Sequence, residues 1–69
     1  MKIAVNGKDV ILENALTIKE LLEAQKVEMQ DYVTVQLNEE FVEREKFDTL
    51  LVNGGDVIEF LYFMGGGAL

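Results

Sequence analysis

The sequence predicts an α+β fold in which a mixed β-sheet of four or five strands carries one main helix packed across one face. Three observations support this prediction. Two strand-like segments flank an Asn6-Gly7 turn, one amphipathic helix begins near Thr17, and no second long helix follows among the later strand candidates. A regular strand–helix–strand series needs a helix at each crossover, so a two-layer arrangement is the simplest solution.

The first two strands are expected at Ile3–Val5 and Val10–Leu12, with Asn6-Gly7-Lys8-Asp9 between them. Asn-Gly is the strongest short-range hairpin signal, because both residues tolerate the positive φ angles that such turns require. We therefore expect an N-terminal β-hairpin.

A helix is expected from residue 17 or 18 to about residue 27. Thr17 and Glu20 have the spacing of a capping box, in which each side chain bonds the backbone amide of the other residue. Ile18, Leu21 and Leu22 fall at positions i, i+3 and i+4, which gives the helix one apolar stripe.

The second half of the chain holds two further strands and short connections. Val33–Leu37 alternates with a period of two and predicts a half-buried strand. Asn38–Glu40 predicts a turn, Phe41–Val42 a short return strand, and Arg44–Leu51 a single short turn of helix. After the turn signal at 53–56, Val57–Phe63 is the longest strand candidate.

The helix is expected to cover one face of this sheet. The predicted inward-facing residues are Ile3, Val5, Val10, Leu12, Val33, Val35, Leu37, Ile58 and Phe60. On the last strand, Glu59 marks the solvent side, which predicts that Leu61 and Phe63 are exposed beside it. An exposed apolar patch on a small domain often marks an interaction site.

The composition of the chain limits the kinds of partner that we expect for it. The chain has 69 residues, a formal net charge of −7, and neither histidine nor cysteine. Its size allows one small domain, and its negative charge would repel phosphate groups, so we expect no nucleic-acid partner and no membrane partner. We expect a cytoplasmic protein that binds a basic surface of another protein or is acidic only for solubility.

No catalytic group and no metal site is expected in the chain itself. Glu39, Glu40, Glu43 and Glu45 are interpreted as a solvated acidic turn, because hard-cation sites need ligands that converge from a defined loop. Gly65-Gly66-Gly67 does not predict a phosphate loop, because no helix comes after it.

The glycine run predicts a flexible tail at 65–69 attached to a folded domain at 1–64. Glycine has no side chain to specify a conformation, and a glycine run passes through constrictions that a Cβ atom would block. The reactive group that such a tail can present is a backbone carboxylate. Either a partner enzyme activates this carboxylate, or the segment is a terminus without a role.

Several short motifs, in the same order, resemble the ubiquitin-like β-grasp sulfur carriers, the family of ThiS-like and MoaD-like proteins. They are Asn6-Gly7, Thr17-Ile18-Lys19-Glu20-Leu21-Leu22, Val35 to Asn38, Val42-Glu43-Arg44-Glu45, Gly55-Asp56 and the glycine run. The helix opening and the Val-Glu-Arg-Glu stretch resemble the thiamin-pathway type more than the molybdopterin type.

This resemblance implies a protein co-substrate that is not itself an enzyme. It implies that an E1-like enzyme uses ATP to adenylate a C-terminal glycine carboxylate. A sulfur donor, such as a cysteine desulfurase or a rhodanese-like protein, then converts it to a thiocarboxylate, and a synthase accepts the sulfur. The resemblance places the activated carboxyl at Gly67, with Gly65 and Gly66 before it, and no cofactor bound to the chain. We expect Leu61, Tyr62, Phe63 and Met64 to form the partner-docking surface.

The end of the chain departs from the family pattern. Such carriers commonly end in Gly-Gly, whereas Ala68-Leu69 comes after Gly67 here. We interpret the chain as a precursor from which a peptidase removes Ala68 and Leu69. The alternatives are a structural relative that is never activated, and a ubiquitin-like modifier or interaction module without sulfur transfer. The sequence leaves open which pathway accepts the sulfur, whether thiamin, cysteine, methionine or another.

Overall fold

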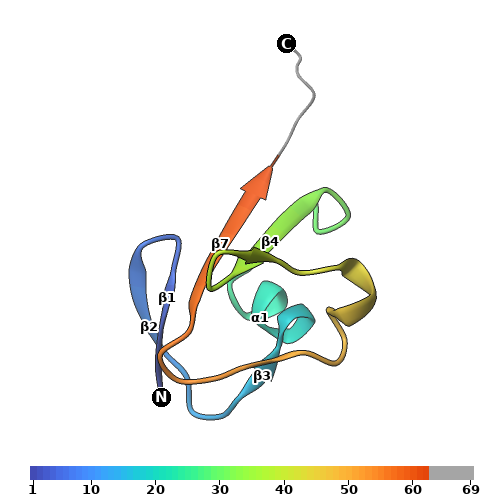
Figure 1. The fold of residues 1–69 in the computed structure, drawn as a ribbon. Coiled ribbons are helices and arrows are strands. Elements are labelled where there is room, and N and C mark those ends of the chain that lie inside the picture. The colour runs from blue at the N-terminus through green and yellow to red at the C-terminus, as the bar shows by residue number, and fades with distance from the viewer. Residues whose placement is uncertain (63–69) are drawn as a thin grey trace.

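A computed structural model describes Met1–Tyr62, and the expectations for 63–69 lie outside the described residues. The predicted mixed sheet with one helix on one face is confirmed (Figure 1). The elements, in chain order, are β1 (Lys2–Val5), β2 (Lys8–Ile11), β3 (Leu16–Thr17), α1 (Ile18–Ala24), β4 (Val33–Leu37), β5 (Glu40–Phe41), the 3₁₀ helix η1 (Arg44–Lys46), β6 (Leu51–Val52) and β7 (Val57–Tyr62).

The last strand lies in the middle of the main sheet. The five strands have the order β2-β1-β7-β4-β5, and a separate two-stranded sheet pairs β3 with β6. β7 runs parallel to β1, with Val5 opposite Ile58, and antiparallel to β4, with Val33 opposite Tyr62. The end of β7, from which residues 63–69 continue, is therefore supported by β4.

The N-terminal hairpin has a tighter turn than the four residues predicted. Val5 pairs with Lys8, so Lys8 and Asp9 belong to β2 and the turn is Asn6-Gly7 alone. Both turn residues have positive φ, 51° and 84°. Two successive left-handed residues match the twist of the flanking strands, and for this reason Asn-Gly suits the turn.

Helix α1 begins as predicted and ends earlier. The Thr17 hydroxyl accepts from the Glu20 amide at 3.1 Å and the Glu20 carboxylate accepts from the Thr17 amide at 2.9 Å, which completes the capping box. The helix ends at Ala24 and not near residue 27, because Lys26 takes a left-handed φ of 57°. The Lys26 amide then bonds the Glu23 carbonyl and the Val27 amide bonds the Leu22 carbonyl, which is a Schellman ending without glycine.

The core lies between the helix stripe and the inner face of the sheet. The predicted stripe of Ile18, Leu21 and Leu22 is fully buried. Of the nine predicted inward residues, Val10, Leu37 and Phe60 are only half-buried and pack against the core from its margin, whereas the other six are buried. The buried residues are Ile3, Val5, Leu12, Ile18, Leu21, Leu22, Val33, Val35, Phe47, Val52 and Ile58.

The segment between β4 and β7 differs from the prediction in its details. The return strand is Glu40–Phe41, one residue earlier than predicted, because Asn38 and Glu39 both have positive φ and complete the turn by themselves. Only Arg44–Lys46 is helical, and Leu51 leaves the predicted helical segment to pair with Thr17 in the small second sheet. That pairing turns Val52 into the core and leaves Leu51 exposed.

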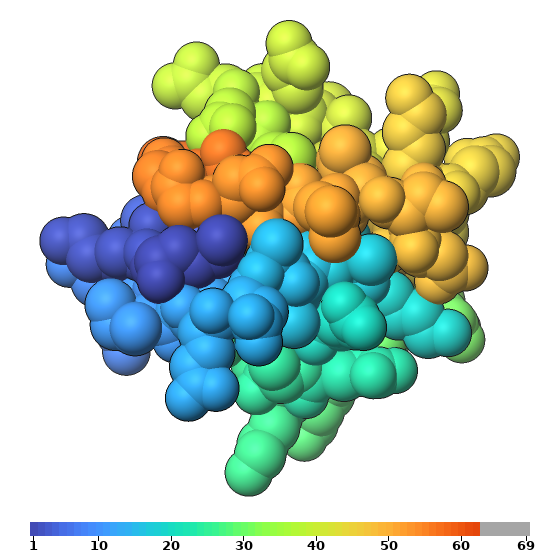
Figure 2. All heavy atoms as spheres, turned by 90° about the horizontal axis from the view of Figure 1, so that it is seen from below, coloured from blue at the N-terminus to red at the C-terminus, as the bar shows by residue number. Residues whose placement is uncertain are grey.

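A turn at 53–56 fixes the start of β7 at the end of the molecule opposite Tyr62. The Asp56 carboxylate accepts from the Asn53 amide at 2.8 Å and from the Asn38 side-chain amide at 3.0 Å. The Gly55 amide donates to the Lys2 carbonyl, so the N-terminal strand and this turn lie side by side (Figure 2).

Candidate functional site

The candidate site is the end of β7, from which the predicted tail continues. Of the residues predicted to act, only Leu61 and Tyr62 lie within the described part of the chain. The predictions for Phe63, Met64, Gly65, Gly66, Gly67, Ala68 and Leu69 fall outside it. The structure therefore describes the surface around the root of the tail.

Leu61 and Tyr62 face opposite sides of the sheet, as strand alternation requires. Leu61 lies opposite Thr34 on the face away from the helix. It is half-buried, so the prediction that it is exposed was wrong. Tyr62 lies opposite Val33 on the helix side, and 43% of its surface is exposed.

The Tyr62 side chain reaches the loop that joins α1 to β4, residues 25–32. Its hydroxyl donates to the Glu28 carbonyl at 2.8 Å. The same loop exposes two more large apolar side chains, Met29 at 51% and Tyr32 at 64%. Sequence reasoning missed this loop, although an apolar Met29 and Tyr32 outside any periodic segment were an available signal.

Arg44 holds this loop in place from η1. Its guanidinium donates to the backbone carbonyls of Gln30, Asp31 and Val33 at 2.9, 2.6 and 2.8 Å. The cation also lies 5.4 Å from the centre of the Phe47 ring. A planar guanidinium offers several donors in one fixed arrangement, so a single side chain can satisfy three carbonyls that belong to no helix.

A groove runs along the other side of β7, next to the hairpin. The β1–β7 pairing ends at Val5 and Ile58, and the Asn6 side chain adds one further bond by accepting from the Phe60 amide at 2.8 Å. Beyond that bond the strand borders a hollow of about 370 Å³. Its lining is Val5, Asn6, Lys8, Asp9, Val10, Gln25, Val27, Phe60 and Tyr62.

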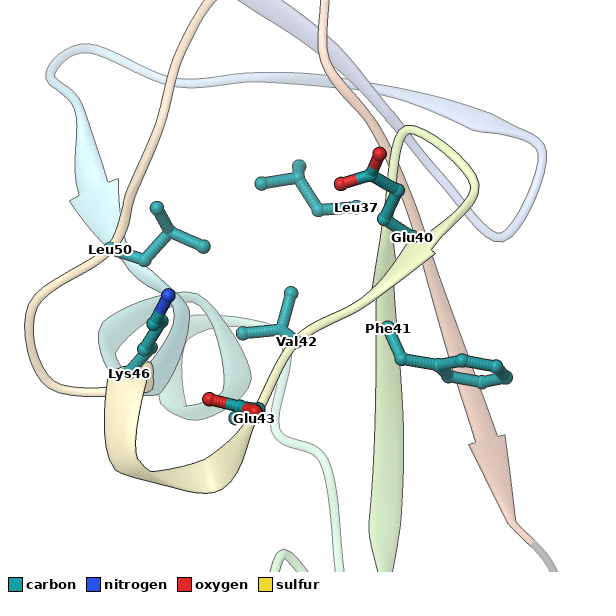
Figure 3. A pocket seen from close by; sticks show the side chains of 7 residues that line it. All are labelled: Leu37, Glu40, Phe41, Val42, Glu43, Lys46 and Leu50. Carbon is teal, nitrogen blue, oxygen red and sulfur yellow. The ribbon is translucent and has the colours of Figure 1, made fainter.

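A second hollow, of about 420 Å³, lies beside β5 and η1. Figure 3 shows Leu37, Val42 and Leu50 pointing toward its centre, while the Phe41 ring points away. Glu40, Glu43 and Lys46 complete its lining. Leu37 lies opposite Ile58, near the start of β7. This hollow is therefore remote from the root of the tail.

Within Met1–Tyr62, no group of three or more acidic side chains converges where it could hold a metal ion. No helix in this part of the chain is long and apolar enough to cross a membrane.

Comparison with known proteins shows which family and which solved structures this chain is similar to. The family model described as the ThiS family matches residues 1–67. A crystal structure titled thiamine biosynthesis protein (ThiS), from Geobacter metallireducens, is similar with a TM-score of 0.89 and 52% identity, covering 97% of this chain and 100% of that one. The solution structure of the Geobacter protein gives a TM-score of 0.77 and covers 100% of this chain and 91% of that one.

Two relatives are similar in sequence. The sulfur carrier protein ThiS of Bacillus subtilis is 36% identical over 64 residues, which are 91% of this chain and 96% of that protein. A thiazole synthase of Paramagnetospirillum magneticum is 32% identical over 68 residues, but the chain spans only 21% of its length. The family match, the fold and the full-length similarity agree: the chain belongs to the ThiS family, with a ubiquitin-like β-grasp fold.

Proposed function

We propose that the chain is a sulfur carrier whose Gly67 carboxyl is converted to a thiocarboxylate for thiamin biosynthesis. The observation that carries this proposal is the ThiS-family match over residues 1–67, which ends on the last residue of the glycine run. The similarity to the Bacillus sulfur carrier over nearly the whole of both chains supports it.

The proposed chemistry uses the backbone of this chain and the catalytic groups of its partners. A Gly67 carboxylate oxygen attacks the α-phosphorus of ATP on an E1-like enzyme, and pyrophosphate leaves. The terminal sulfur of a protein persulfide then attacks the acyl carbon and AMP departs. The product is an acyl disulfide, and a second thiol then attacks the donor cysteine's sulfur, which forms a disulfide between these two sulfurs and releases the thiocarboxylate on Gly67. Adenylation is needed because a free carboxylate is a poor electrophile.

The two residues after Gly67 must be removed before this reaction. Ala68 and Leu69 lie beyond the residues that the family model matches. We propose that a peptidase cleaves after Gly67, because a pocket shaped for a glycine carboxylate would exclude a leucine side chain. Gly65 and Gly66 then form the narrow segment that enters the partner.

Partners can be inferred from the same chemistry. They are the E1-like enzyme, a persulfide donor such as a cysteine desulfurase or a rhodanese-like protein, and a synthase that accepts the sulfur. The similarity to part of a thiazole synthase supports a thiazole-forming acceptor. For docking we propose Leu61, Tyr62, Phe63 and Met64, which immediately precede the glycines.

The test is reconstitution with a chain that ends at Gly67, using the E1-like enzyme of the same host, ATP and a persulfide source. Mass spectrometry should show the mass gain of one oxygen replaced by sulfur. The matched control is the 69-residue chain, which should remain unloaded. A Gly67-ended chain that forms protein–protein adducts but never a thiocarboxylate would instead support a ubiquitin-like modifier.

A further inference from the structure

Three exposed apolar side chains gather at the end of β7. Met29, Tyr32 and Tyr62 are 51%, 64% and 43% exposed. They belong to one neighbourhood, because the Tyr62 hydroxyl bonds the Glu28 carbonyl and the Tyr32 amide bonds the Met29 carbonyl at 2.9 Å. Figure 1 shows the loop after α1 beside the end of β7. We refer to Met29, Tyr32 and Tyr62 as the tail-root surface.

The loop that carries this surface has a fixed shape. Arg44 binds two of its carbonyls, those of Gln30 and Asp31, and also the carbonyl of Val33, the first residue of β4, which pairs with Tyr62 in the sheet. Met29 takes a left-handed φ of 56°, which is unfavourable for a residue with a side chain and persists only where its surroundings impose it. A surface held in shape before binding loses little conformational freedom when a partner covers it.

The position of Gly67 in the chain identifies the partner that covers this surface. Gly67 follows Tyr62 by five residues, so its carboxyl lies at most about 18 Å from Tyr62. An enzyme that holds this carboxyl in its active site must therefore stand against this end of the domain. This inference rests on the proposed function.

Charge indicates the chemistry of the covering partner. The loop carries Glu28 and Asp31, both exposed, and the cation that reaches it, Arg44, is engaged with its carbonyls. Lys26 is an exposed cation near the start of the loop, so the two acidic side chains outnumber it, and the whole chain has a net charge of −7. A partner surface that complements the tail-root surface is therefore apolar at its centre and basic at its rim.

We propose that Met29 and Tyr32, together with Tyr62, dock the adenylating enzyme that receives the Gly67 carboxyl, through an apolar patch flanked by Lys or Arg. The loop after α1 thereby becomes a second contact besides the strand that leads into the tail. Its function is to bring the carboxyl into place, so it acts on productive binding and not on the chemical step.

The test compares two double variants of the Gly67-ended chain, in which every described hydrogen bond and core residue is retained. M29S with Y32S removes two members of the tail-root surface. I11S with L51S is the matched control, because Ile11 and Leu51 are 71% and 48% exposed and lie on β2 and β6, away from the end of β7. ATP–pyrophosphate exchange by the host's E1-like enzyme is measured against carrier concentration.

We expect M29S with Y32S to raise KM about tenfold or more with kcat within about twofold, and the control to leave both unchanged. A third variant, E28K, alters an exposed side chain and should raise KM by an amount that shrinks as salt increases. If circular dichroism shows that the double variant is unfolded, the KM of E28K tests the proposal in its place.

The outcomes separate the two proposals. If the wild-type Gly67-ended chain supports exchange but neither the double variant nor E28K changes KM, this inference is overturned and the proposed function stands. If the wild-type Gly67-ended chain supports no exchange, this inference and the proposed function fail together. A dimer of the wild-type chain that M29S with Y32S dissociates, with KM unchanged, would assign the surface to a second copy and overturn the proposal.

Discussion

Replacing Arg44 by alanine is expected to destabilise the domain by about 2–3 kcal/mol. The substitution removes three charge-assisted hydrogen bonds, to the carbonyls of Gln30, Asp31 and Val33. The bond to Val33 is partly buried and contributes about 1.5–3 kcal/mol, whereas water can replace the exposed bonds to Gln30 and Asp31, which contribute about 0.5 kcal/mol each or less. Part of this total is offset by relaxation of the loop.

Urea unfolding monitored by circular dichroism measures this change. With a slope of about 1 kcal/mol per molar for a domain of this size, the midpoint should fall by about 2–3 M. R44K keeps the charge but loses the planar arrangement of donors, so it should recover less than half of the loss. K46A is the matched control, because Lys46 belongs to the same η1 helix and its side chain forms no ion pair within the described residues.

Amide hydrogen exchange locates the effect. In R44A the amides of Tyr32 and of the residues around Val33 should exchange faster than global unfolding allows, while the β1–β2 hairpin should exchange only through global unfolding. An R44A midpoint within about 0.5 M of the wild type, or a loss spread evenly over the chain, would refute the assignment of Arg44 as the support of this loop.

Three further changes to the chain, two sets of substitutions and one deletion, test other features. T17A should cost about 1 kcal/mol in urea unfolding, because it removes one half of the capping box, and a loss below about 0.3 kcal/mol would contradict that assignment. N6G should be milder than N6A, because both lose the bond to the Phe60 amide but only glycine tolerates the φ of 51° without strain; equal losses would show that the backbone angle contributes nothing. Deleting Gly66 and Gly67 should abolish sulfur loading and leave the unfolding midpoint unchanged, and a lowered midpoint would indicate that the tail packs against the domain.

Short sequence motifs predicted those elements whose structure is determined by residues close together in the sequence. The Asn6-Gly7 turn, the Thr17–Glu20 capping box and the alternation of Val33–Leu37 each specify their structure within a few residues. Together with the strand candidate Val57–Phe63 and the lack of a second long helix, these signals predicted the sheet and the helix that crosses it.

The elements that were missed depend on tertiary contacts. The two-residue strands β3 and β6 exist because Leu16–Thr17 and Leu51–Val52 meet across the helix start, which no local pattern reveals. The early end of α1 was missed because Lys26, and not a glycine, adopts the left-handed angle. Strand alternation placed Leu61 on the outer face correctly, but it could not give the extent of its burial.

The candidate site was predicted only in part for a similar reason. The sequence directed attention to the glycines and to the strand before them, both of which are contiguous in the chain. The loop with Met29 and Tyr32 is about thirty residues away and reaches the same place through the Tyr62–Glu28 bond and the Val33–Tyr62 pair. Only the folded topology brings it to the root of the tail.

Intact-mass spectrometry of the protein isolated from its native host tests the proposed carrier function most directly. We predict a species that ends at Gly67, part of which carries the mass gain of one oxygen exchanged for sulfur and loses it on hydrolysis to the carboxylate. A protein found only with Ala68 and Leu69 still attached, and never with that mass gain, would contradict the proposal that this chain carries sulfur.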